Sequence, residues 1–238
     1  MHDDVRHALS YPFPIPDYSF LFGGGTYQVM HAMDIAHRDR APVLAAGSNQ
    51  SPEQLTRKYH MIGDAGAIPA ERGVLHDFDV VYAAHLSAYG SVPATFQSSP
   101  GTAVTVFVLW LTEGQLLRMH ETEGNYFYDR LPDIRVETDF GETLTEAFAY
   151  TARNGCFNHR GGPLALAEIS AINRHLPEAG QAHAQEFVRD RIVPEQSLED
   201  FVTETIHDER ERHRRVAAMA EDALPPAFER ETLMDLGN

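Results

Sequence analysis

The sequence predicts an α+β protein with a mainly β body, short inserted helices and a helical C-terminal third. Three observations support this prediction. Runs rich in β-branched and aromatic residues, broken by Gly or Pro, recur between residues 42 and 150. Two helix-start patterns fall between these runs. From Gly161 onward, apolar residues recur at roughly helical spacing.

The first 40 residues are predicted to be largely irregular. Prolines at every other position of the segment 11–18 exclude regular helix there. Phe20–Phe22 is predicted as a short strand, and the three glycines that follow as a flexible turn. They are not expected to form a phosphate-binding loop, because no Gly-Lys-Ser/Thr follows them. A helix is predicted over Gln28–His37.

A short apolar run at 42–46 is predicted to be a buried strand that enters a turn at Gly47-Ser48-Asn49. Ser51 as N-cap, Pro52 as first helical residue and Gln54 in a capping box predict a helix that ends near Tyr59. A strand, a glycine turn and a helix N-terminus leave backbone N–H groups directed outward, where they can bind a carboxylate or an oxyanion. The local pattern alone favours an ordinary strand-to-helix connection over such a binding site.

Further strands are predicted over five ranges, with a hairpin turn at Asp139-Phe140-Gly141. They are 80–87, 92–97, 104–112, 128–138 and 143–150.

The stretch 112–130 is the most informative. Thr112 and Gln115 form a predicted capping box, and the apolar series of the helix passes through Met119 toward Glu123. A carboxylate on the core side costs free energy unless it is paired, so Glu123 is expected to be either bonded or functional. Gly124 then lets the chain turn sharply away.

The C-terminal part is predicted to be helical from Gly161, with a break between Pro177 and Gly180. A last helix is expected to start at Ser197, and its charged block 207–215 mixes both signs, as a solvated helix face does. Pro225-Pro226 should end it, and the final dozen residues are expected to be loose.

Composition narrows the function classes. A net charge of −16 over 238 residues argues against nucleic acid and anionic membranes as partners. No apolar run approaches the ~20 residues of a membrane span. The single Cys156 and the absence of a signal-peptide pattern lead us to expect a cytoplasmic protein. The 13 histidines match no zinc-ligand spacing, so no metal site is expected.

Several segments, in order, resemble the gamma-glutamylcyclotransferase-like family. Ala45–Leu55 resembles its Tyr-Gly-Ser-Asn signature, and Leu116–Arg130 resembles its acidic stretch, in which a Glu-Gly pair precedes Tyr-x-Arg. Further matches are Tyr89–Phe96, Tyr150–Arg153 and the segment from Gly162. The resemblance implies a mixed-strand β-barrel domain over residues 41–193, with an N-terminal extension at 1–40 and a C-terminal helical extension at 194–238, all in one compact unit.

The resemblance also implies a reaction that needs no cofactor. The α-amine of a gamma-glutamyl compound attacks its own side-chain carbonyl, which releases 5-oxoproline and an amine or amino acid. Glu123 would be the general acid/base, with its pKa raised by an apolar environment above the ~4.3 of a free Glu. The N–H groups of Gly47, Ser48 and Asn49 would hold the substrate carboxylate or the oxyanion, and Tyr128 would orient base or substrate.

One departure from the family concerns the pocket wall. Ala46 occupies the position at which the family signature usually has an aromatic residue. The sequence therefore does not determine the size or identity of the substrate. An aromatic side chain from 18–22 is expected to fill that space.

The alternatives remain open at this point. Glu123 could be a structural carboxylate bonded to Arg130 or to a backbone donor. Glu121 is a rival base and Cys156 a rival nucleophile. The same fold could instead serve an amidase, an acyl transferase or a non-catalytic small-molecule-binding protein, and a homodimer is compatible with the sequence.

Overall fold

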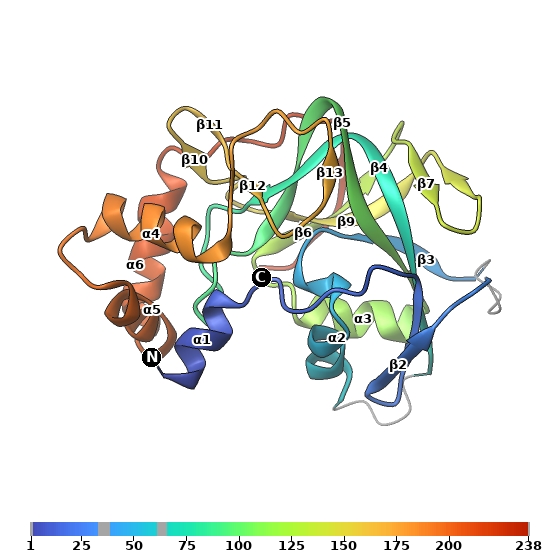
Figure 1. Ribbon diagram of the computed structural model, residues 1–238, viewed down its shortest axis with the longest axis horizontal. Coiled ribbons are helices and arrows are strands. Elements are labelled where there is room, and N and C mark those ends of the chain that lie inside the picture. Colours follow the sequence, from blue (N-terminus) through green and yellow to red (C-terminus); the bar gives the residue numbers. More distant parts are fainter. Residues whose placement is uncertain (1, 33–38, 61–65, 238) are drawn as a thin grey trace.

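The computed structural model describes residues 2–32, 39–60 and 66–237. It is a mixed α+β structure in which one large sheet is flanked by helices (Figure 1). Six α-helices and one 3-10 helix occur in the described residues: α1 Asp3–Leu9, η1 Ser48–Gln50, α2 Pro52–Tyr59, α3 Glu113–Glu121, α4 Gln181–Ile192, α5 Leu198–His207 and α6 Glu209–Ala220.

The described strands are mostly short, apart from two long central ones. They are β1 Phe20–Gly23, β2 Thr26–Val29, β3 Ala41–Ala45, β4 Ile68–Tyr82, β5 Ala94–Leu111, β6 Tyr126–Leu131, β7 Val136–Thr138, β8 Thr143–Leu144, β9 Ala147–Ala152, β10 Asn158–His159, β11 Gly162–Pro163, β12 Ala165–Leu166, β13 Ala171–Ile172, β14 Glu178–Ala179 and β15 Glu231–Asp235.

Pairing among the described strands places β3 near the middle of the sheet. The main order is β14-β12-β4-β5-β3-β9-β6-β15, and β1, β2, β7, β8 and β13 attach to this row. Strand β3 runs antiparallel to β5 and parallel to β9. The row has two ends and does not close, so the predicted barrel is not confirmed, whereas the α+β class is.

Alternation along β3 separates two buried clusters. Val43 and Ala45 pack with residues of α2 and α3, and Leu44 and Ala46 join the larger cluster on the other side. Helices α2 and α3 lie side by side under the sheet, while α4, α5 and α6 gather with α1 at one end of the molecule (Figure 1). The loop after β3 therefore emerges between two packed layers.

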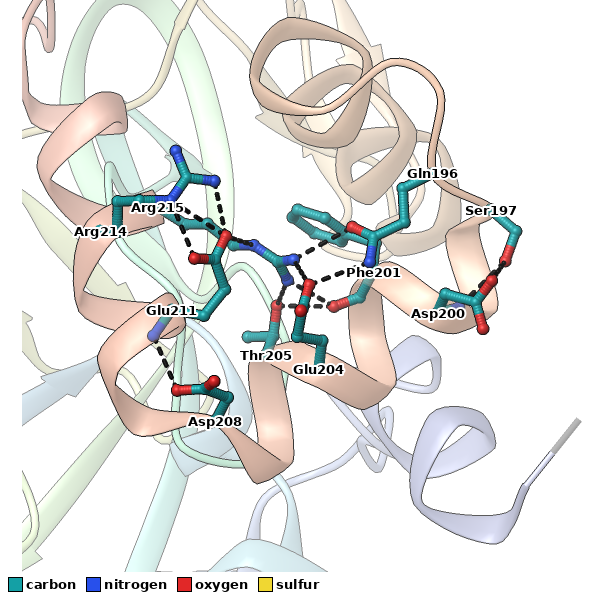
Figure 2. Close-up of polar contacts among 10 residues, drawn as sticks. All are labelled: Gln196, Ser197, Asp200, Phe201, Glu204, Thr205, Asp208, Glu211, Arg214 and Arg215. Atoms are coloured by element: carbon teal, nitrogen blue, oxygen red, sulfur yellow. Dashed lines mark hydrogen bonds and ion pairs between the residues drawn. The ribbon is translucent and has the colours of Figure 1, made fainter.

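A buried arginine joins the C-terminal helices (Figure 2). The Arg215 guanidinium, on α6, donates to the Phe201 carbonyl and the Thr205 hydroxyl of α5, each at 2.6 Å. It also binds Gln196 Oε1 at 3.0 Å, pairs with Glu204, and pairs with Glu211 at 3.1 Å. Because the side chain has no exposed surface, these partners satisfy a charge that water does not reach.

Several sequence predictions are confirmed. Strands β1 and β3, helix α2 and the capping box of α3 lie where they were predicted. The turn 139–141 joins β7 to β8 in antiparallel pairing. Ser197 caps α5 by accepting from the Asp200 N–H at 3.1 Å.

Other predictions of secondary structure are wrong. The apolar repeat between 161 and 180 forms the short strands β11 to β14, and helix starts only at Gln181. Backbone pairing of β12 with β4 and of β13 with β5 outweighs the roughly helical spacing there. The predicted last helix is two helices that meet at Asp208, and part of the final dozen residues forms β15, which pairs with β6.

Boundaries nearer the N-terminus also differ. The predicted strands 92–97 and 104–112 are one strand, β5, and most of 80–87 is a loop after β4. The strand predicted over 128–138 is divided between β6 and β7, and the one over 143–150 between β8 and β9. The predicted helix 28–37 begins with the last residues of strand β2, and its residues 33–37 lie outside the described residues.

Ser51 precedes α2 but makes no side-chain capping bond, so no capping box forms there. The domain boundaries at 40 and 193 stay predictions.

Candidate active site

Glu123 and the loop after β3 line one cavity of about 300 Å³. The loop contributes Ala46, Gly47, Ser48 and Asn49, and α2 contributes Gln54 and Lys58. A second loop, residues 83–93 between β4 and β5, forms another part of the lining and is called the wall loop below. The structure thus brings Glu123 together with every sequence-predicted site residue except Tyr128.

The local fold explains why Glu123 faces inward. Thr112 and Gln115 bond reciprocally, at 2.9 Å and 3.4 Å, and fix the start of α3. Glu123 lies just past the helix end, and its N–H donates to the His120 carbonyl at 3.2 Å. The residue is only 6% exposed, so its carboxylate must find partners inside the protein.

Those partners are polar. Asn49 Nδ2 donates to Glu123 Oε1 at 2.9 Å, and the same oxygen forms an ion pair with Lys58 Nζ. Lys58 is itself 6% exposed, so this is a buried pair within the cavity lining. The expected apolar environment of Glu123 is therefore wrong, because an ammonium and an amide contact its carboxylate. Arg130, the alternative partner, instead pairs with Glu146 and Glu231.

Lys58 was not predicted as a site residue, although the sequence contains a signal for it. Leu55, Lys58 and Tyr59 lie on the buried face of α2. A lysine within the apolar face of an amphipathic helix needs a buried partner for the same reason as Glu123. A buried cation on α2 and a buried carboxylate just after the adjacent helix α3 indicate that the two side chains form a pair.

Additional acceptors lie beside this ion pair. The side-chain oxygens Asn49 Oδ1 and Gln54 Oε1 are buried and have no hydrogen-bond partner among the described residues. Both residues line the cavity together with Glu123. Three acceptor groups in one small cavity suit a ligand that donates several hydrogen bonds, such as a protonated amine.

Backbone donors are available at the same place. Within the described part of the chain, the N–H groups of Gly47 and Asn49 donate to no protein acceptor. Free N–H groups in a turn before a helix suit a carboxylate or a developing oxyanion. The cavity can therefore bind one positively charged group and one negatively charged group.

An aromatic side chain does lie against the loop, next to Gly47, but it is Tyr11. Its hydroxyl accepts from the Ala94 N–H at 2.9 Å, and its ring lines the cavity. Burial raises the pKa of Tyr11 well above its ordinary value. The range 18–22 does not supply this residue, since Tyr18 is 37% exposed and Phe20 and Phe22 pack in the other cluster. Residues of the N-terminal segment thus belong to the cavity.

Gly47 is required by this contact. A Cβ placed on Gly47 would lie 2.0 Å from Tyr11 Oη and 3.0 Å from Ala94 Cβ. We expect Gly47→Ala to lower the free energy of unfolding by about 1–3 kcal/mol through overpacking. In a Tyr11→Phe background, which removes the colliding oxygen, the same change should cost markedly less. Urea denaturation of the four proteins measures both, and equal costs in the two backgrounds would show that Tyr11 is not the obstacle.

The wall loop contributes a buried imidazole, that of His85, which was not predicted from the sequence. Its ring lies edge-on to Tyr126, with centroids 5.1 Å apart. Burial lowers the pKa of His85 to about 3, so it is neutral at physiological pH. Burial also raises the pKa of nearby Tyr89 to about 12.

This pKa predicts a pH dependence of stability. The unfolded chain protonates His85 near pH 6.5, whereas the folded chain does not until about pH 3. Stability from this group is thus complete above pH 6.5 and falls as pH drops below it, by about 1.4 kcal/mol per unit.

Between pH 7.5 and pH 5, His85→Gln should therefore lose about 2 kcal/mol less stability than the parent protein. Urea denaturation at the two pH values checks this. Identical pH dependence in both proteins would contradict the placement of His85.

Three other predicted or rival residues lie outside the cavity. Tyr128 packs on His120 and Phe148, and the aromatic lining comes from Tyr11, Tyr89, Tyr126 and Tyr150 instead. Glu121 forms an ion pair with Arg118 at the surface. Cys156 is buried beside Gln97, and burial raises the pKa of its thiol, which disfavours a nucleophile.

Two further observations concern metal binding and membrane-spanning helices. Among the described residues, no group of three or more His, Cys, Asp or Glu side chains is placed to hold a metal ion. None of the helices that the structure describes is both long and apolar enough to cross a membrane.

No model of a known protein family matches the sequence, and no curated protein is similar to it. Solved structures with some similarity include a gamma-glutamyl cyclotransferase, at 13% identity and TM-score 0.36 over 92% of this chain and 95% of that one. An uncharacterized Homo sapiens protein aligns at 14% identity and TM-score 0.37, over 92% and 96%. An Arabidopsis thaliana protein aligns at 19% and 0.35, over 49% and 70%. At these values, the similarities do not assign the chain to a family.

Proposed function

We propose that this protein is a cofactor-independent enzyme that cyclises a gamma-glutamyl compound to 5-oxoproline and releases an amine or amino acid. The substrate class comes from the sequence resemblance of 45–55 and 116–130. The observation that supports it most is the buried Glu123 carboxylate, bonded to Asn49 of the 46–49 loop inside a cavity that both line.

The lining groups match the two charges of a gamma-glutamyl head group. Its α-ammonium would donate to Glu123, Asn49 Oδ1 and Gln54 Oε1, which are acceptors in the cavity. Its α-carboxylate, or the oxyanion of the intermediate, would accept from the N–H groups of Gly47 and Asn49. Ser48 is less suited to this role than predicted, because its backbone N–H acts on the Tyr11 hydroxyl and partly offsets the rise that burial causes in the pKa of Tyr11.

The proposed reaction needs one proton shuttle. Glu123 takes a proton from the α-ammonium, and the freed amine attacks the side-chain carbonyl carbon to form the lactam C–N bond. The bond to the leaving nitrogen then breaks as Glu123 returns the proton to that nitrogen. The ring nitrogen gives up its second proton to the released amine, which leaves as an ammonium, and Glu123 ends as a carboxylate. Both reacting groups belong to one molecule, so the protein mainly has to hold the folded-back conformation.

Lys58 would keep Glu123 in place. The ion pair leaves one carboxylate oxygen, Oε2, without a hydrogen bond to the described residues, since Asn49 and Lys58 both contact Oε1. Oε2 is thus the atom that would accept the substrate proton.

A panel of gamma-glutamyl amines, amino acids and peptides tests the proposal. Incubation with the protein should yield 5-oxoproline and the free amine in equal amounts, measured by NMR or chromatography. Free glutamate would instead indicate an amidase, and a transferred gamma-glutamyl adduct an acyl transferase. Binding without turnover of any compound would favour a non-catalytic binding protein.

A further inference from the structure

The proposed reaction does not use the imidazole of His85, which lines the cavity. The side chain is 2% exposed, and neither Nδ1 nor Nε2 has a hydrogen-bond partner among the described residues. Buried polar atoms in native proteins are nearly always paired, and an unpaired one calls for an explanation. Because His85 lines the cavity, a bound molecule can supply that partner.

The imidazole is neutral, which limits what it can recognise. Burial lowers the pKa of His85, whereas on the pKa of His120 the charge of Glu123 also acts. A neutral imidazole has one N–H donor and one nitrogen acceptor. Its best partner is an uncharged group that can both donate and accept, such as a hydroxyl or an amide.

The surroundings of His85 also disfavour a charged partner. The nearby lining residues of the wall loop and the start of β5 are uncharged: Ser87, Ala88, Tyr89, Pro93 and Ala94. Among the described lining residues, Lys58 is the only Lys or Arg, and Glu123 already neutralises it. A carboxylate placed beside His85 would lose its hydration without gaining a cation.

We propose that His85 determines specificity by hydrogen-bonding an uncharged polar group on the leaving amine. The enzyme would therefore prefer gamma-glutamyl amines that carry a hydroxyl or amide over those with a purely apolar or a carboxylate-bearing leaving group. This inference rests on the proposed function, because it assigns the head group to the Glu123 end of the cavity and the leaving amine to the His85 end.

Three compounds with leaving groups of similar size test the inference: gamma-glutamylethanolamine, gamma-glutamylpropylamine and gamma-glutamylglycine. The wild-type protein should show kcat/KM at least roughly tenfold higher for the ethanolamine compound than for the other two. His85→Leu should reduce the ethanolamine-to-propylamine ratio to near one, and His85→Gln, which keeps a donor and an acceptor, should restore part of it. Equal rates in the wild type, or an unchanged ratio in His85→Leu, would overturn the inference.

Calorimetric binding of the same compounds separates this inference from the reaction itself. A preference for the ethanolamine compound in binding, with no 5-oxoproline formed, would support the role of His85 and refute the proposed reaction. Formation of 5-oxoproline without that preference would support the reaction and refute the role of His85. If His85→Leu does not fold, the wild-type ratios alone decide.

Discussion

Glu123→Gln is expected to lower kcat for 5-oxoproline formation by about 10²–10⁴-fold, because an amide cannot take up and return the substrate proton. The substituted side chain has nearly the same shape, so the cavity and the Asn49 contact region should persist. Initial rates of 5-oxoproline release, with the fold checked by circular dichroism, measure the effect. Glu121→Gln is the matched control: this exposed carboxylate pairs with Arg118 and should change kcat less than about twofold.

A loss of stability could mimic this result, because Lys58 would lose its buried counter-charge. Removing one member of such a pair typically costs about 3–5 kcal/mol. The double variant Glu123→Gln/Lys58→Met leaves no unpaired charge and should recover much of the lost stability, but none of the activity. If activity returned with stability, Glu123 would be a structural carboxylate and the proposed mechanism would be wrong.

Arg215→Ala is expected to lower the free energy of unfolding by about 3–5 kcal/mol, because it leaves buried polar groups without their cation. These groups are the carboxylates of Glu204 and Glu211, the Phe201 carbonyl, the Thr205 hydroxyl and the Gln196 amide oxygen. Figure 2 shows how the guanidinium joins α5 to α6. The Arg215 guanidinium also lies 4.2 Å from the Phe201 ring centroid, so that contact is lost too. Urea denaturation measures the change.

Arg214→Ala provides a control at the adjacent position. Arg214 pairs with the same Glu211, but its side chain is 53% exposed, so its removal should cost less than about 1 kcal/mol. Similar losses for the two variants would mean that burial of Arg215 does not carry the stabilisation.

The sequence predicted the elements whose signals are local. The Thr112–Gln115 capping box and the strand, turn and helix across 41–59 depend on neighbouring residues, and all are present except the capping bond at Ser51. Glu123 was found because a carboxylate on an apolar helix face demands a partner. The structure places it in one cavity with the 46–49 loop.

Long-range contacts explain what the sequence did not reveal. Tyr11 reaches Ala94 across 83 residues of chain, and Lys58 reaches Glu123 across 65. No local sequence motif marks His85. Its burial in the cavity lining is evident only from the structure. Likewise, β12 and β13 form because β4 and β5 offer pairing partners, which no helical periodicity could reveal.

The most direct test of the central claim follows the α-nitrogen of the substrate. A gamma-glutamyl amine labelled with ¹⁵N at its α-amine is incubated with the wild-type protein and with Glu123→Gln, and the product is observed by ¹⁵N NMR. The account predicts that the label appears in the lactam ring of 5-oxoproline with the wild-type protein and stays in the substrate with the variant. Label in free glutamate, or equal lactam formation by both proteins, would contradict it.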